Sequence, residues 1–126
     1  MSAHDAYRRA VEARDRAGLS ACFAEDMVFH SPTKLRPFEG RAFALWLFDQ
    51  LFEVLEDFQF TEEAEGAAVS VLFFTCTIGG RAAEGCDVLR FDEAGLIRDF
   101  RVLIRPLKAV EALNEAMGAR LAGQTR

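Results

Sequence analysis

Residues 69–104 read VSVLFFTCTIGGRAAEGCDVLRFDEAGLIRDFRVLI, a stretch of apolar-rich runs separated by glycine-containing turns. The first run, Val69–Ile78, is dominated by β-branched and aromatic side chains and ends at a Gly79-Gly80 pair. Runs of this composition are typical of strands, and a glycine pair between two of them is typical of a hairpin. We therefore predict an antiparallel meander of strands over residues 69–78, 81–91 and 96–104.

Helices are predicted on both sides of this meander. Apolar residues cover most of the circumference of a helix over residues 41–55, so that helix should be buried on nearly all sides. Ser2 can cap a first helix, which we expect to end at Gly18. The other predicted elements are a short helix at Leu19–Ala24, a strand at Met27–Ser31, a loop at Lys34–Gly40, a strand through Phe58 and Phe60, and a closing helix from Pro106. This order predicts an α+β fold with helices packed on one face of a curved sheet.

Composition and charge limit the classes of function. The chain has 126 residues, 51% hydrophobic and 28% charged, which predicts one folded domain over residues 1–126. Its net charge of −5 disfavours nucleic acid and anionic membrane surfaces as partners. Three cysteines without a CxxC pair, and no recognisable signal peptide or membrane span, predict reduced thiols and a cytoplasmic location. Twelve Phe against one Tyr and one Trp indicate an apolar interior or cavity.

Several short motifs resemble those of one protein superfamily. They are Tyr7, Phe23-Ala24-Glu25-Asp26, Pro32, Gly40, Gly85-Cys86-Asp87 and Phe91-Asp92-Glu93-Ala94-Gly95. Together they resemble the SnoaL-like branch of the NTF2-like superfamily over most of the chain. The resemblance implies a cone, in which a strongly bent antiparallel sheet wraps around three helices and leaves a deep apolar pocket, with a C-terminal helix added. Because this superfamily includes isomerases, cyclases, dehydratases and non-enzymatic domains, the fold does not determine the function.

Ketosteroid isomerase is the member of this superfamily whose mechanism bears most directly on these residues. By resemblance, Tyr7 and Asp87 take the places of its two oxyanion donors, and Asp87 would be a protonated acid. Ser31 takes the place of its general base, an Asp that precedes a Pro. A serine hydroxyl cannot replace a carboxylate base near neutral pH. The resemblance therefore implies two of the three catalytic roles and leaves proton transfer unassigned.

Considered without the resemblance, each of these positions allows more than one interpretation. Asp87 shares a strand face with Leu89, so its carboxyl must be protonated or hydrogen-bonded, either as a pocket donor or as a structurally partnered group. Tyr7 lies on the apolar stripe of its helix and is either a core residue with a local partner or a catalytic donor. His30 and Ser31 are strand neighbours that point to opposite faces, so they cannot act as a nucleophile and base. His30 would serve as a base only if a bulge turned it inward.

No metal or cofactor is predicted, because no cluster of His, Cys or carboxylate residues has the spacing of ligands. His4 is expected in a mobile terminus. The acidic run Glu62–Glu65 is expected in a solvated loop at a turn. Cys22, Cys76 and Cys86 are interpreted as small buried hydrophobes.

Two functions remain open, and both use an apolar pocket. The first is an enzyme that binds a small apolar carbonyl- or phenol-like molecule and catalyses its isomerisation, cyclisation or dehydration without a cofactor. The second is a non-catalytic ligand-binding or dimeric scaffold domain. The pocket is expected to be walled by some of Tyr7, Phe43, Trp46, Leu47, Phe58, Phe73, Leu89, Phe100 and Val102. By resemblance, a homodimer would form through the outer sheet face, which carries Val88, Arg90, Arg101, Leu103 and Arg105.

Overall fold

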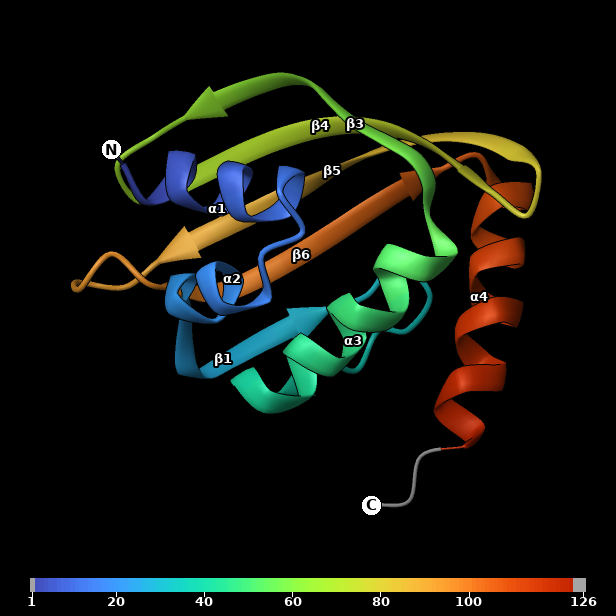
Figure 1. Cartoon of the computed structure of the whole chain (residues 1–126), viewed down its shortest axis with the longest axis horizontal. Coiled ribbons are helices and arrows are strands. Elements are labelled where there is room, and N and C mark those ends of the chain that lie inside the picture. Colours follow the sequence, from blue (N-terminus) through green and yellow to red (C-terminus); the bar gives the residue numbers. More distant parts are fainter. Residues whose placement is uncertain (1, 124–126) are drawn as a thin grey trace.

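The computed structural model describes residues 2–123, which form an α+β fold of four helices and a six-stranded sheet (Figure 1). In chain order the elements are α1 (Ala3–Glu12), α2 (Arg16–Cys22), β1 (Phe23–His30), β2 (Phe38–Glu39), α3 (Arg41–Val54), β3 (Glu56–Glu65), β4 (Val69–Ile78), β5 (Arg81–Phe91), β6 (Ile97–Arg105) and α4 (Leu107–Ala122). The sheet is curved and open, with the strand order β2-β1-β6-β5-β4-β3. The predicted cone is therefore confirmed.

The meander that the sequence predicted forms most of the sheet. β4 and β5 pair antiparallel from Val69 opposite Arg90 to Ile78 opposite Arg81. Gly79 and Gly80 join them with φ angles of 56° and 79°, a left-handed pair that a two-residue hairpin requires. Only β1 departs from the antiparallel pattern, because it pairs parallel with β6 after the long excursion through α3 and β3–β5. The sheet of residues 2–123 is therefore mixed.

The N-terminal elements have different bounds from those predicted. α1 ends at Glu12, well before Gly18. Gly18 instead lies in the first turn of α2, where its N–H donates to the side chain of Asp15, the N-cap, at 3.0 Å. The predicted helix at Leu19–Ala24 is therefore wrong at both ends, because the Asp15 cap starts the helix earlier and the chain becomes extended at Phe23.

His4 and the acidic run Glu62–Glu65 do not occupy the mobile terminus and the loop that we expected. His4 is 1% exposed, because it lies one turn before Tyr7 on the buried stripe of α1. Its Nε2 atom lies 2.8 Å from Oε1 of Glu63. Glu63 also pairs with Arg8, and the run Glu62–Glu65 belongs to β3 rather than to a loop. Glu63 thus links α1 to the edge strand β3.

Helices α1, α2 and α3 cover one face of the sheet, and α4 runs along the end where the β4–β5 hairpin turns (Figure 1). Side chains alternate between the two faces along β4, and along β5 and β6 in the region of Asp87 and Val102. One cross-strand row on the covered face contains Leu72, Asp87 and Val102. The alternation therefore places Asp87 on the face that the helices cover.

Gly85 lies on the covered face of β5, where the neighbouring atoms leave no room for a side chain. A Cβ atom there would lie 2.1 Å from the carbonyl oxygen of Leu103 and 2.9 Å from the Phe74 ring. Because the backbone oxygen cannot move without breaking the β5–β6 ladder, Gly85→Ala is expected to lower the free energy of unfolding by about 3 kcal/mol or more. Urea denaturation would measure this change.

Gly118 in α4 supplies the matched control, since an added Cβ there meets nothing within 4 Å. Gly118→Ala is expected to raise the free energy of unfolding by about 1 kcal/mol, through the better helix propensity of alanine. Unchanged stability of Gly85→Ala would contradict the close approach of β5 and β6.

Candidate functional site

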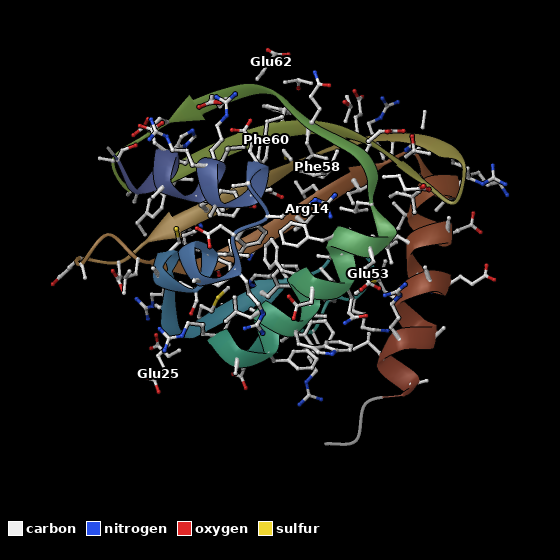
Figure 2. The ribbon with its side chains drawn as sticks, viewed as in Figure 1. Arg14, Glu25, Glu53, Phe58, Phe60 and Glu62 are labelled. Atoms are coloured by element: carbon white, nitrogen blue, oxygen red, sulfur yellow. The ribbon has the colours of Figure 1, made fainter. Side chains whose placement is uncertain are left out.

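A cavity of about 240 Å³ lies inside the cone, between the sheet and the helices. Its wall is mainly apolar, and much of it is aromatic, with Phe29, Phe48, Phe58, Phe60, Phe74 and Phe100 among its residues. Phe58 and Phe60 extend from β3 into this interior (Figure 2). A concave apolar space with few polar groups is the usual form of a small-molecule site.

Tyr7 and Asp87 meet in the wall of this cavity, although they are 80 residues apart in the sequence. The Tyr7 hydroxyl donates a hydrogen bond to Oδ2 of Asp87 at 2.7 Å. Both residues are buried, with 1% and 4% of their surfaces exposed. A capping box between Ser2 and Asp5 fixes the start of α1, and the alternation of β5 turns Asp87 inward. The pair therefore joins the N-terminal helix to the centre of the sheet.

Burial controls the ionisation of both groups. Loss of hydration raises the pKa of Asp87 to about 7, while the hydrogen bond from Tyr7 acts in the opposite direction. Burial, followed by the negative charge of Asp87, raises the pKa of Tyr7 well above its usual value, so its hydroxyl stays protonated. Near neutral pH, Asp87 can therefore be present in either form. Its Oδ1 atom makes no hydrogen bond within residues 2–123 and is available to a ligand.

Ser31 and His30 lie on opposite sides of the end of β1. Ser31 lines the cavity, and its Oγ accepts a hydrogen bond from the Lys34 N–H at 3.2 Å. His30 faces the outside of the sheet, where its Nε2 lies 3.0 Å from Oδ2 of Asp99. No bulge turns His30 inward, since it pairs in register with Arg101. The position next to the cavity therefore carries a hydroxyl and not a carboxylate or an imidazole.

The structure divides the predicted wall residues into two groups. Those that line the cavity are Tyr7, Leu47, Phe58, Phe100 and Val102. Leu89 is buried in the core but does not reach the cavity, and Phe43 stacks on Trp46 with ring centroids 5.5 Å apart, away from it. Phe73 is 47% exposed on the outer face, because Leu72 and Phe74 on either side of it point inward.

Other cavity residues were not predicted from the sequence. Leu113, Met117 and Leu121 of α4 close one side of the cavity, but only the tertiary structure places this helix against it. Arg14 also lines the cavity, and no local pattern indicated this, because it lies in the left-handed turn after the C-cap of α1.

No group of three or more His, Cys, Asp or Glu residues between positions 2 and 123 could hold a metal ion. None of the helices in that range is both long and apolar enough to cross a membrane.

Comparison with known proteins gives one family and several similar structures. The family model described as SnoaL-like domain matches residues 4–100. A steroid delta-isomerase from Pseudomonas aeruginosa is 34% identical with a TM-score of 0.88, covering 95% of this chain and 89% of that one. An uncharacterized bacterial protein with a cystatin-like fold, from Silicibacter pomeroyi, is 30% identical with a TM-score of 0.91, covering 97% and 86%.

A more distant structure, from Mycobacterium tuberculosis, is a complex with estradiol-17β-hemisuccinate. It is 23% identical to this chain with a TM-score of 0.65, and the match covers 85% of this chain and 93% of that one. This likeness is one of fold. No curated protein matches the chain.

The raised pKa of Asp87 predicts how stability depends on pH. The pKa is about 7 in the folded protein against 3.8 for an unperturbed carboxyl, so between these values the folded state holds a proton that the unfolded chain releases. Stability conferred by protonated Asp87 is therefore complete below about pH 4 and is lost as the pH rises through about 7. The loss amounts to about 4 kcal/mol in the free energy of unfolding.

Asp87→Asn removes this titration and keeps the shape of the side chain. Urea denaturation of both proteins over a pH series would measure the stability of the wild type relative to the variant, which is expected to fall with rising pH. A relative stability that rises with pH would mean that Asp87 is ionised in the folded state.

Proposed function

The chain belongs to the SnoaL-like domain family, and from that premise we propose that it binds a small apolar carbonyl- or phenol-like molecule through Tyr7 and Asp87. The observation that carries the proposal is a buried hydrogen-bonded acid and phenol in the wall of an apolar cavity. Such a pair is costly to bury and offers an otherwise apolar ligand one polar point of attachment.

The two protonation states of Asp87 suit two kinds of ligand oxygen. Protonated Asp87, whose Oδ2 accepts from Tyr7, donates through Oδ1 to a carbonyl or enolate oxygen, and ionised Asp87 accepts from a phenolic hydroxyl. Donors held in a dry cavity stabilise an oxyanion as it develops, as isomerisation, cyclisation or dehydration of a carbonyl compound would require. The 34% identity to a protein named steroid delta-isomerase supports a carbonyl compound as the substrate.

A non-catalytic binding module is the second candidate, and Ser31 favours it. Proton abstraction needs a base, and the cavity position next to β1 offers only this hydroxyl. The two candidates differ in one measurement, which is turnover of an unconjugated ketosteroid by the wild-type protein. Turnover supports the isomerase, whereas binding without turnover supports the binding module.

Removal of the Tyr7 hydroxyl tests the proposed site. Tyr7→Phe loses one neutral hydrogen bond, worth about 0.5 to 1.5 kcal/mol, so it should weaken binding of para-propylphenol by roughly 2- to 13-fold. Asp87→Leu should weaken binding as well, since it removes the second polar partner. Isothermal titration calorimetry on the purified protein would measure both dissociation constants.

Thr75 provides a control for the loss of a hydroxyl, because it is exposed on the outer face of β4 and does not line the cavity. Thr75→Val should leave the affinity for para-propylphenol unchanged. Equal affinities of wild type, Tyr7→Phe and Asp87→Leu would overturn the proposed site.

A homodimer through the outer sheet face is the proposed assembly. Phe73, Cys86 and Leu103 form one cross-strand row on this face, and Phe73 and Leu103 are 47% and 53% exposed. Exposed apolar side chains flanked by charged ones, here the ion pair of Arg105 with Glu84, are typical of an interface.

Sedimentation velocity would test this assembly. Leu103→Glu places a charge at the centre of the proposed interface, so the wild type should sediment as a dimer and the variant as a monomer. Leu35→Glu is the matched control, because Leu35 is 98% exposed on a loop away from the sheet face. A monomeric wild type at high concentration would disprove the dimer.

A further inference from the structure

One helical stripe connects the buried pair to the mouth of the cavity. Tyr7, Val11 and Arg14 all line the cavity, with spacings of four and three residues along α1 and its C-terminal cap. Tyr7 and Val11 lie one turn apart on the same face of α1, and Arg14 follows the C-cap Ala13 in the left-handed turn that ends the helix. The stripe therefore begins at a phenol and ends at a cation.

Arg14 occupies a backbone position that usually belongs to glycine. It follows Ala13, the C-cap of α1, with a φ of 51°. The N–H of Arg14 donates to the Val11 carbonyl and the N–H of Asp15 donates to that of Ala10, the two bonds of a Schellman motif. Because a side chain at left-handed φ costs free energy that glycine would avoid, the side chain of Arg14 is expected to have a role.

The guanidinium of Arg14 is held in place but keeps free donors. Its Nη1 atom donates to the Phe52 carbonyl at 2.8 Å, and its Cζ atom lies 5.2 Å from the centroid of the Phe52 ring. Figure 2 shows Arg14 between α1 and α3. Its Nε and Nη2 atoms make no hydrogen bond to any described residue. These two atoms form one edge of the guanidinium fork, which matches a carboxylate with two parallel hydrogen bonds.

The other charged residues of the cavity wall complete a rim that favours anions. Lys34 lines the cavity and is exposed on the loop after β1. Glu12 is the acidic group of the rim, and its Oε2 atom lies 3.4 Å from Nε of Arg8, which offsets its charge. The rim thus carries two cations and one paired carboxylate on a chain whose net charge is −5.

We propose that Arg14 is the recognition residue for a carboxylate on the ligand, so that the cavity takes a bipolar molecule. Its apolar body would lie in the aromatic cavity, its carbonyl or phenolic oxygen at Tyr7 and Asp87, and its carboxylate at the free edge of Arg14. This inference rests on the proposed function, because it assumes that a ligand oxygen reaches the Tyr7–Asp87 pair. Because Tyr7 and Arg14 line the cavity from different turns of the chain, affinity should depend on the length of the ligand between that oxygen and its carboxylate.

Matched ligands separate the carboxylate from the rest of the molecule. Para-hydroxyphenyl alkanoates of increasing chain length are compared with their neutral carboxamides and with para-alkylphenols of equal length, by isothermal titration calorimetry. The wild type should bind the carboxylate of optimal length about tenfold more tightly than its carboxamide, equivalent to about 1.4 kcal/mol. This advantage should shrink as ionic strength rises.

Arg14→Gln should abolish the preference for the carboxylate over the carboxamide, with a smaller change in the affinity for para-alkylphenols. Arg14→Gly gives the same test with a residue that suits the left-handed turn, in case the glutamine variant folds poorly. Arg16→Gln is the control, because Arg16 pairs with Asp49 and does not line the cavity. The control should retain the wild-type preference.

The outcomes distinguish this inference from the proposed function. Binding of para-alkylphenols with no preference for the carboxylate would overturn the role of Arg14 and leave the Tyr7–Asp87 site intact. An equal loss of affinity for all ligands in Arg14→Gln and Arg14→Gly would show that Arg14 only joins α1 to α3, and would also overturn the inference. Absence of binding by every ligand to the wild type would overturn both proposals.

Discussion

The hydrogen bond from Tyr7 to Asp87 is the contact on which the interior of this protein depends. It satisfies a carboxyl that the alternation of β5 forces onto the apolar face of the sheet, and it fixes α1 over that face. Without the phenol, Asp87 would be a buried acid with no partner among the described residues, at a cost comparable to a large part of the stability of a small domain. The same bond leaves Oδ1 of Asp87 open to the cavity.

Aromatic side chains surround the Tyr7–Asp87 pair and form much of the cavity wall. The Tyr7 ring packs edge-on against Phe60 and Phe100, and Phe29 stacks on Phe100 with ring centroids 5.3 Å apart. These rings fill the space around the pair without bringing further polar groups that would need partners. Helix α4 closes the remaining side, where Arg120 bonds to Gln50 and Glu53 of α3. The apolar cavity thus results from packing between elements far apart in the sequence.

The mouth and the interior of the cavity differ in chemistry. The interior offers one phenol and one acid of adjustable protonation, and the rim offers Arg14 and Lys34. An apolar molecule with a polar group at each end would match both regions, whereas a molecule polar throughout would lose hydration along the aromatic wall. Arg14 follows the C-cap of α1, in the left-handed turn that ends the helix.

The sequence by itself determined the meander, the helix α3 and the inward side of Asp87, because alternation and helical periodicity are local properties of the chain. It also indicated the SnoaL-like family through short motifs. It did not determine the burial of α3, since only Ala44, Leu45, Leu47 and Phe48 of that helix are buried. The bounds of α2 were misplaced because the Asp15 cap competes with Gly18 as a helix boundary signal. Only the tertiary structure joined Tyr7 to Asp87, buried His4 against Glu63 and brought α4 to the cavity. Each of these contacts is made by residues far apart in the sequence, and a local sequence pattern does not show which distant segments meet.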